Sequence, residues 1–433
     1  MCPAAGGEAR IELGAESVGP KARLPKRLPD GQGVDARETE DGGGAQGVQA
    51  FDHRMAADAN AGARCHGGRI IAQPVKAAVS HEFAVPLSVE DVVLDAPREG
   101  EVQVRVHACG ICHSDITFID GLWGGQLPAV YGHEVAGVVT AAGPAVDLLA
   151  PGDHVVVTLV RVCGKCFYCG RGMPTQCEGR FAIDERAVLK TAGGERITQG
   201  VRVGGFAEAV TVHASQAIAI PKSIPLESAC LLSCAVATGV GAVRNTAAVE
   251  AGASVAVVGA GGVGTNSVQA ARIAGASPVI AVDVSDSRLE AACRLGATEA
   301  VNASRPDAVD AVKALAADRG VDYVIVASGN PAAIELGLRL ARRAGTVVLV
   351  GMTASGQTVP INPGDVADSA LRILGCKLGD VRPMEDISML IDLYRTGALK
   401  LDQLVTARYP LDRINDAIAN ARRGDGLRTV IQM

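Results

Sequence analysis

Short runs of β-branched and apolar residues, broken by Pro and Gly, recur along the chain from residue 74 onward. The segments PVKAAVSHEFAVPLSVEDVVL and GEVQVRVHACG are examples, and such a pattern is typical of strands and turns. A β-rich region is therefore expected over about 72–225. After about residue 235, apolar strands of four to six residues alternate with alanine-rich helical stretches. That alternation predicts βαβ units around a parallel sheet.

Residues 1–71 differ in composition from the rest of the chain. Gly, Ala, Arg and Asp dominate, Pro recurs, and no run of large apolar residues could form a core. Such segments bury too little apolar surface to offset the entropy of ordering, so we expect a disordered extension without chemistry. An alternative interpretation is that the natural chain starts at Met55 or near it.

The composition of the chain limits the kinds of molecule that it is expected to bind. The 433-residue chain is 48% apolar, carries a formal net charge of −6 and contains 3% aromatic residues. Its length allows two domains with their own cores, and the acidic balance predicts no binding to nucleic acid. The longest uncharged run, 251–271, is too polar in its second half for a membrane span. The N-terminus lacks an apolar signal region, so we expect a cytoplasmic protein with reduced thiols.

Four cysteines are concentrated in the segment VCGKCFYCGRGMPTQC. Cys163, Cys166, Cys169 and Cys177 follow the spacing C-x2-C-x2-C-x7-C, and tetrahedral zinc takes four thiolates at about 2.3 Å. We predict a structural zinc site in a lobe over about 160–180, with no open position for chemistry. Unrelated buried cysteines are one alternative. An iron–sulfur cluster is another, but the C-x2-C-x2-C-x3-C-P run expected for it is absent from the sequence.

Three further residues are candidates for a second metal site: Cys112 in GICHSD, His133 in GHE, and Cys234 at the start of a predicted helix. Taken singly, the thiols could be small buried hydrophobes and the imidazole a core histidine. Together, two thiolates and one imidazole form a three-ligand zinc site with a fourth position open to water or substrate. This arrangement is the one found in alcohol dehydrogenase.

A nucleotide-binding fingerprint follows. Gly259, Gly261 and Gly264 form a G-x-G-x-x-G motif directly after an apolar strand at 254–258 and before an alanine-rich helix. Asp283 ends the next predicted strand, nineteen residues after Gly264, where a carboxylate would bind ribose hydroxyls and repel a 2′-phosphate. The pattern favours NAD over NADP. A glycine-rich turn in another α/β fold is the alternative.

From about residue 72 to 433 the chain resembles the zinc-containing medium-chain alcohol dehydrogenases, of the medium-chain dehydrogenase/reductase family. The cysteine lobe, GICHSD, GHE, Cys234 and GAGGVG occur in that family's order and spacing. The resemblance implies an α/β fold with a GroES-like β-barrel catalytic domain and a Rossmann coenzyme domain with a doubly wound parallel sheet. The implied boundaries are 72–235 for the first catalytic part, 236–377 for the Rossmann domain and 378–433 for the last catalytic part.

The resemblance also implies roles for individual residues. The three candidate ligands match the catalytic zinc ligands, and Glu134 matches a carboxylate beside the metal. Ser114 matches a proton-relay hydroxyl, and Asp115 matches a carboxylate that orients a ligating histidine. Coenzyme contacts are implied for His113, Thr238, Gly259, Gly261, Gly262, Val263, Gly264, Asp283, Arg288 and Arg428.

Two positions depart from the family pattern. Many members have a histidine that completes the proton relay where this chain has Thr117, so the relay is expected to run from Ser114 through a ribose hydroxyl directly to water. Thiol-adduct dehydrogenases of the family have an acidic residue in the substrate pocket where this chain has Trp123. Leu159 is expected to line the same pocket. Both side chains favour an apolar alcohol.

The implied function is zinc- and NAD-dependent, reversible oxidation of an alcohol to an aldehyde or ketone, with one catalytic and one structural zinc per chain. A thiol-adduct (glutathione-dependent formaldehyde) dehydrogenase is the main alternative. A non-catalytic nucleotide-binding regulator is a remote one, because all three candidate ligands are present. An interaction module built on the zinc lobe would leave the nucleotide fingerprint unexplained.

The connection between Cys177 and Cys234 is long and resembles that of dimeric branches of the family, so we expect a homodimer. The predicted strands in VDYVIVASG and GTVVLVGM are expected to extend the sheet and could pair with the sheet edge of a partner.

Overall fold

The computed structural model describes residues 65–66, 69–70, 72–424 and 426–433. Strands β1 (Cys65–His66) and β2 (Arg69–Ile70) form a small antiparallel pair within the segment predicted to be a disordered extension, and that disorder stays a prediction. The rest of the segment predicted to be disordered lies outside the described residues.

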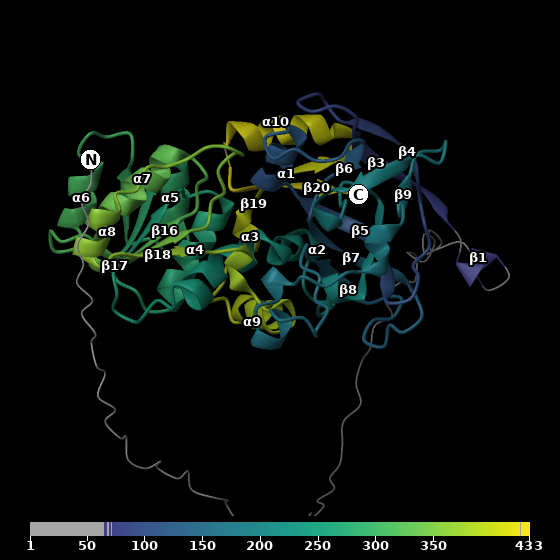
Figure 1. The fold of residues 1–433 in the computed structure, drawn as a ribbon, viewed down its shortest axis with the longest axis horizontal. Coiled ribbons are helices and arrows are strands. Elements are labelled where there is room, and N and C mark those ends of the chain that lie inside the picture. Colours follow the sequence, from purple (N-terminus) through teal and green to yellow (C-terminus); the bar gives the residue numbers. More distant parts are fainter. Residues whose placement is uncertain (1–64, 67–68, 71, 425) are drawn as a thin grey trace, which may run out of the picture. The chain divides into compact units, whose positions relative to one another are not determined.

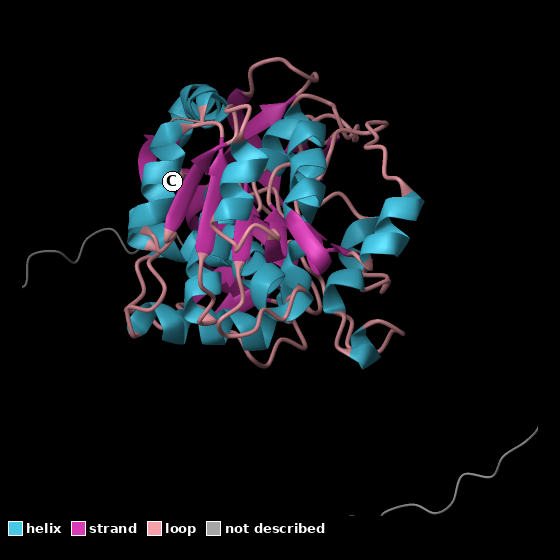
Figure 2. Cartoon of the chain, turned by 90° about the vertical axis from the view of Figure 1, so that its left-hand side faces the viewer, coloured by secondary structure: helices cyan, strands magenta, loops and turns pink. Residues whose placement is uncertain are grey.

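A six-stranded parallel sheet forms the core of the coenzyme-domain region. Its strand order is β15-β14-β13-β16-β17-β18, the doubly wound order that leaves a crevice at the carboxyl ends of β13 and β16. Helices lie on both sides of this sheet (Figures 1 and 2), which confirms the predicted βαβ pattern. The strands are β13 (Val255–Val258), β14 (Val279–Asp283), β15 (Glu299–Asn302), β16 (Val321–Val326), β17 (Ala341–Leu349) and β18 (Arg372–Gly375).

Two further sheets form the catalytic-domain region. A closed barrel has the order β10-β6-β3-β4-β9, and a seven-stranded sheet has the order β12-β8-β7-β5-β20-β19 with β11 also paired to β5. Strand β20, at the end of the chain, pairs with β5 (Figure 1), so the C-terminal segment completes this sheet. The strands are β3 (Gln73–Ser80), β4 (Ser88–Leu94), β5 (Glu101–Gly110), β6 (Ala129–Val130), β7 (Glu134–Ala142), β8 (His154–Val157), β9 (Leu189–Lys190), β10 (Arg196–Gln199), β11 (Ala209–His213), β12 (Ala217–Ala219), β19 (Val405–Pro410) and β20 (Arg428–Gln432).

The α-helices of the described residues are short to medium in length. They are α1 (His113–Ile119), α2 (Leu226–Ala229), α3 (Ala235–Gly241), α4 (Gly262–Ile273), α5 (Asp286–Arg294), α6 (Ala308–Ala314), α7 (Pro331–Leu340), α8 (Pro363–Ser369), α9 (Pro383–Arg395) and α10 (Ile414–Arg423). No single helix among them is long and apolar enough to cross a membrane. The helical segments Leu226–Ser233 and Ala235–Thr246 would pass that test only as a pair, and they are bent by 50°.

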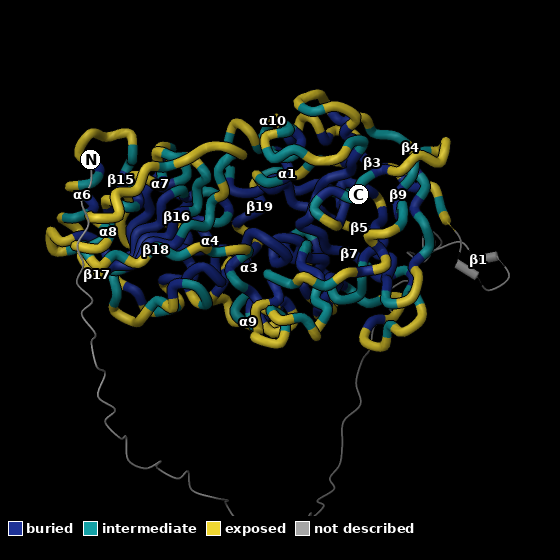
Figure 3. The backbone as a smooth tube through the Cα atoms, in the orientation of Figure 1, coloured by how far each residue is buried: buried dark blue, intermediate teal, exposed yellow. Residues whose placement is uncertain are grey.

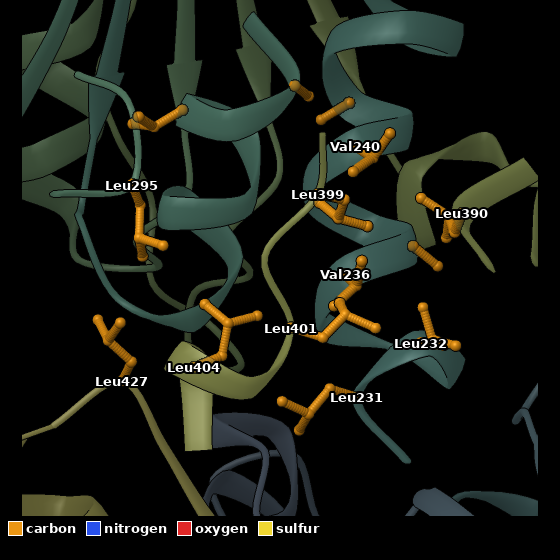
Figure 4. Close-up of a cluster of buried hydrophobic side chains, with 14 of the residues drawn as sticks. Leu231, Leu232, Val236, Val240, Leu295, Leu390, Leu399, Leu401, Leu404 and Leu427 are labelled. Atoms are coloured by element: carbon orange, nitrogen blue, oxygen red, sulfur yellow. The ribbon is translucent and has the colours of Figure 1, made fainter. Parts of the chain in front are cut away.

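Helix α3 links the catalytic sheet to the coenzyme sheet. Val236 and Val240 on this helix pack in a buried cluster with Leu390 and Leu399 (Figure 4). On another face, Gly239 touches the backbone of α4, and the Ser267 hydroxyl donates a hydrogen bond to the Gly239 carbonyl at 3.0 Å. A Cβ atom at Gly239 would lie 2.4 Å from the Val263 carbonyl oxygen. Only glycine permits this approach of the two helices.

Two predicted strands extend the parallel sheet as expected, but the suggestion that they could pair with the sheet edge of a partner was wrong. The strands in VDYVIVASG and GTVVLVGM are β16 and β17, and both lie inside the sheet with neighbours on each side. The sheet edges among the described strands are β15 and β18. The sequence could not show this because β18 is short and only partly buried, which gives it a weak strand signal.

Replacing Gly239 with Ala should weaken the packing of α3 on α4. Overpacking of this kind costs about 1–3 kcal/mol of unfolding free energy, which chemical denaturation can measure. Gly170→Ala is the matched control, because a Cβ there meets no atom within 4 Å. Equal unfolding free energies for the two variants would contradict the proposed role of the α3–α4 contact.

Candidate active site and metal centres

A cleft of about 1680 Å³ runs between the two sheet regions. Its walls come from α1, the loops after the parallel strands, the segment before β20 and the four-cysteine lobe. The cleft therefore joins the crevice at the carboxyl ends of the parallel sheet to the candidate metal ligands. Such a crevice is the usual ligand site of doubly wound sheets.

Four buried side chains form a possible metal site at the floor of this cleft. One donor atom from each of Cys112, His133, Glu134 and Cys234 lies within 4.8 Å of every other. Cys112 precedes α1, Cys234 precedes α3, and the other two stand at the start of β7. A hydrogen bond between the two thiols lowers the pKa of Cys112 well below its usual value and raises that of Cys234. A divalent cation at this site would bind both sulfurs as thiolates and displace their protons.

Asp115 organises this cluster from within helix α1. Its Oδ1 lies 2.8 Å from Nδ1 of His133 and accepts a hydrogen bond from the Gly132 amide, while Oδ2 accepts one from the Cys112 amide. The carboxylate is fully buried. With Nδ1 donating to Asp115, the lone pair of the ring lies on Nε2, the nitrogen available to a metal. This is the usual carboxylate–histidine arrangement around zinc.

Glu134 and Arg428 form a second buried layer behind the cluster. Burial raises the pKa of Glu134 to about 7, opposed by the positive charge of Arg428, whose Nη2 lies 3.5 Å from Oε1 of Glu134. A Cβ at Gly110 would lie 2.3 Å from Oε2, so glycine is needed beside this carboxylate. Neither Glu134 oxygen has a hydrogen-bond partner among the described residues. A buried carboxylate without such partners favours a nearby cation.

The glycine-rich loop lies where the fingerprint places it, between β13 and α4. Gly259 has a positive φ of 93°, which glycine adopts without strain. A Cβ at Gly264 would lie 1.8 Å from the Gly259 carbonyl oxygen, and one at Gly262 would lie 2.4 Å from Nε of Arg428. The guanidinium group therefore lies directly against the loop, where it would face a pyrophosphate. Val263 also lines the cleft.

Asp283 lies at the end of β14 and closes the loop from the other side. Its Oδ2 accepts a hydrogen bond from the Ala260 amide at 2.7 Å, and its Oδ1 accepts one from the Ser285 amide at 2.9 Å. Arg288 lies 3.9 Å from the same carboxylate and donates to the Gly424 carbonyl. Both residues line the cleft, at the end expected to bind the adenosine.

The remaining predicted coenzyme contacts also line the cleft. His113 is exposed at the start of α1. Thr238 lies one turn after Cys234, and its buried hydroxyl has no hydrogen-bond partner among the described residues. A buried hydroxyl without a protein partner, directed at a cleft, is suited to bind a polar group of a ligand.

The predicted substrate pocket lies beside the metal cluster. Ser114, Trp123 and Leu159 all line the cleft. Thr117, the residue in place of the relay histidine, donates its hydroxyl to the His113 carbonyl at 2.9 Å. That hydrogen bond occupies the Thr117 proton, so the free hydroxyl nearest the cluster in this helix is that of Ser114.

Two hydrogen bonds join the cleft walls at Leu122 and Trp123, and neither was predicted. The indole Nε1 donates to the Thr353 carbonyl at 2.8 Å, and the Ser355 amide donates to the Leu122 carbonyl at 3.2 Å. The Phe118 ring packs edge-on against the indole at 5.1 Å. The two hydrogen bonds link residues more than 200 positions apart, so no local pattern could predict them.

The four cysteines of the lobe come together as predicted. Every Sγ lies within 4.8 Å of the other three, and two of the separations are 4.0 Å. A tetrahedral site with metal–sulfur bonds of about 2.3 Å has sulfur atoms about 3.8 Å apart. Backbone amides donate to several of these sulfurs, and those of Cys169 and Glu178 lower the pKa of Cys166 to about 6. The geometry and the stabilised thiolate both fit a closed zinc site.

Two family models match separate segments of the chain. Residues 98–222 match the family model of the alcohol dehydrogenase GroES-like domain. Residues 262–395 match the model described as zinc-binding dehydrogenase. These matches confirm the predicted combination of a GroES-like domain with a Rossmann domain.

The match with this chain spans nearly the whole length of several similar proteins. An NDMA-dependent alcohol dehydrogenase of Amycolatopsis methanolica is 36% identical over 82% of this chain and 98% of its own. An S-(hydroxymethyl)glutathione dehydrogenase of Saccharomyces cerevisiae is 33% identical over 84% of this chain and 97% of its own. The crystal structure of benzyl alcohol dehydrogenase from Acinetobacter calcoaceticus has a TM-score of 0.78 and 32% identity, covering 83% of this chain and 99% of that one.

Replacing Asp115 with Asn should weaken zinc binding at the Cys112–His133–Cys234 cluster. Loss of such a histidine partner typically lowers metal affinity about 10–100-fold. Zinc retained against a competing chelator measures the effect. Asp416→Asn, which removes only an exposed ion pair with Arg413, is the control. Equal zinc retention in both variants would show that Asp115 does not position the metal site.

Acidification should release metal from the four-cysteine lobe. The pKa of Cys166 is depressed to about 6, so its thiolate persists above that pH and is lost as the pH falls through it. Metal binding requires thiolates, and bound zinc competes with protons for them, so we expect the lobe to release zinc on acidification at a pH below the pKa of the metal-free Cys166 thiol. Cys166→Ser should abolish zinc binding by the lobe and lower the melting temperature. A Cys166→Ser variant with parental zinc content and melting temperature would contradict the assignment.

Proposed function

Because this chain belongs to the zinc-containing medium-chain alcohol dehydrogenase family, we propose that it oxidises an uncharged, apolar alcohol reversibly with zinc and NAD. The chain is an oxidoreductase that acts on CH–OH groups, as the named alcohol dehydrogenases similar to it do. One observation carries the finer proposal: the buried metal-ligand cluster opens into the same cleft as the glycine-rich loop.

The donor set fits zinc, and the loop fits a dinucleotide. Cys112, His133 and Cys234 supply the two thiolates and one imidazole of an open catalytic site, with Glu134 beside them. When bound, zinc would supply a Lewis acid that lowers the pKa of the alcohol, and NAD would supply the hydride acceptor. A second zinc, in the four-cysteine lobe, would be structural.

The residues of the chain would orient the metal ligand His133 and carry the proton of the substrate away. Asp115 holds His133 in the tautomer that leaves Nε2 free. Ser114, which lines the cleft, would receive the substrate proton and pass it toward solvent, because the Thr117 hydroxyl donates to a carbonyl. The two hydrogen bonds at Trp123 hold the cleft walls together over the pocket. Excluding water there would protect the hydride transfer step.

Charges along the cleft support NAD as the coenzyme. Burial opposes the charge on Arg428, but Glu134 and the cluster thiolates outweigh this effect and raise its pKa. Arg428 therefore stays cationic against the loop and can bind pyrophosphate. Asp283, at the ribose end, would repel the 2′-phosphate of NADP.

The substrate wall supports a plain alcohol over a thiol adduct. Among the described cleft-lining residues between 111 and 238, none is Asp, Glu, Lys or Arg. S-(hydroxymethyl)glutathione carries two carboxylates and an ammonium group, and charges taken out of water need charged or strongly polar partners. Ile116, Phe118, Trp123 and Leu159 instead offer an apolar surface.

A homodimer is part of the same proposal. Strand β18 is an open sheet edge, and helix α8 has no buried residue (Figure 3). An open edge beside an exposed helix is suited to pair with a second copy of the chain.

The test is oxidation of an alcohol panel by the zinc-loaded protein with NAD. We expect benzyl alcohol and hexanol to be oxidised faster than S-(hydroxymethyl)glutathione, and Cys112→Ser to abolish turnover. Parallel reactions contain NDMA as the oxidant, because one similar protein is NDMA-dependent. Turnover of only the glutathione adduct would overturn the substrate proposal. Parental turnover by Cys112→Ser would overturn the ligand assignment.

A further inference from the structure

The four-cysteine lobe contributes a side chain to the substrate wall. Gln176 ends the short helix η2 (Pro174–Gln176), directly before the ligand Cys177, and lines the cleft. Its backbone N–H donates to the Met173 carbonyl at 3.0 Å, and Pro174 and Thr175 are buried. The backbone position of Gln176 is thus fixed by the lobe.

Gln176 lies at the end of the cleft opposite the adenosine site. Helix η2 packs against η8 (Leu378–Asp380), which follows the edge strand β18. Asp283 ends β14, and the strand order separates β14 from β18 by four strand spacings. At about 4.8 Å per spacing, this is about 19 Å across the sheet. Gln176 therefore belongs to the substrate half of the cleft.

The side-chain amide of Gln176 differs from its surroundings. Ile116, Phe118, Leu159 and Val201 line the same cleft with apolar side chains, and Lys377 and Asp380 line it from the η8 segment. No described residue forms a hydrogen bond with the Gln176 side chain, and the residue is half-buried. A wholly apolar substrate that covered it would remove the amide from water without offering a partner, which is unfavourable.

We propose that Gln176 is a specificity-determining residue that hydrogen-bonds an uncharged polar group, such as a hydroxyl, at the distal end of an otherwise apolar alcohol. This inference rests on the proposed function and narrows its substrate class. The amide both donates and accepts, so it accommodates a hydroxyl. Lys377 and Asp380, in the η8 segment against which η2 packs, also line the cleft, so the choice of an uncharged group rests on the neutral amide of Gln176 itself.

The test compares matched alcohols in the zinc-loaded protein with NAD. The pairs are 3- and 4-hydroxybenzyl alcohol against 3- and 4-methylbenzyl alcohol, in which a methyl group replaces the hydroxyl at similar size. Trp123 is the single tryptophan of the sequence and lies on the pocket wall, so its fluorescence reports binding independently of turnover. Both kcat/KM and Kd are measured for each alcohol.

The variant Gln176→Met keeps the length and flexibility of the side chain and removes its hydrogen bonds. We expect the hydroxyl-over-methyl preference in Kd and kcat/KM to fall about tenfold for at least one pair. Gln176→Glu keeps an acceptor for a hydroxyl and should retain that preference. Glu178→Gln, an exposed neighbour on the other side of Cys177, is the lobe control and should match the parent.

Several results are decisive. An unchanged hydroxyl-over-methyl ratio in Gln176→Met would overturn the inference, as would an equal loss of that ratio in Glu178→Gln. Parental zinc content and melting temperature for Gln176→Met exclude loss of the lobe as the cause of a changed ratio. If the parent protein shows the hydroxyl preference in Kd but oxidises neither alcohol, the proposed oxidation fails while the recognition by Gln176 stands.

Discussion

The close contact between helices α3 and α4 fixes the distance between the metal ligands and the nucleotide loop. Cys234 precedes α3, Thr238 lies one turn later at the cleft, and Gly239 touches the backbone of α4. Helix α4 begins in the glycine-rich loop itself. One rigid contact between backbones, possible only with glycine, thus sets where a zinc-bound substrate and a coenzyme would meet. Reactions of bound partners depend on such positioning at ångström precision.

A second constraint is the unfavourable free energy of burying charged groups at the floor of the cleft. Cys112, His133, Glu134 and Arg428 are all buried, and several of their polar atoms have no partner among the described residues. Such a cluster would be unfavourable in a protein that used it only for packing. A divalent cation and a pyrophosphate would satisfy those atoms. The buried polar groups that are unfavourable without a ligand are therefore the groups expected to bind the cation and the pyrophosphate.

Much of this arrangement could be predicted from the sequence, because the chemistry lies in short motifs. The four-cysteine site, the glycine loop and the alternation of strands and helices follow from local patterns in the sequence. Cys234 was harder to place, since a single cysteine before a helix becomes a candidate ligand only together with Cys112 and His133. The family resemblance supplied that combination.

Contacts between distant segments could not be predicted. The Trp123–Thr353 hydrogen bond and the placement of Gln176 on the cleft wall depend on how the domains pack, and neither residue stands in a recognisable motif for it. The edge position of β18 was missed because two more apolar strands, β16 and β17, gave stronger signals. The predicted domain boundaries remain predictions, since the strands and helices show where each region has its core but not where each domain ends.

The central claim is that an open metal site and a closed metal site coexist, and that only the open one meets substrate. Replacement of zinc by cobalt(II) tests this directly, because visible absorption bands report the ligands of each site. Adding benzyl alcohol without NAD should shift the bands of a site with two sulfurs and one nitrogen, and leave the bands of the four-sulfur site unchanged. A spectrum of four-sulfur sites alone, or one that benzyl alcohol does not alter, would contradict the account.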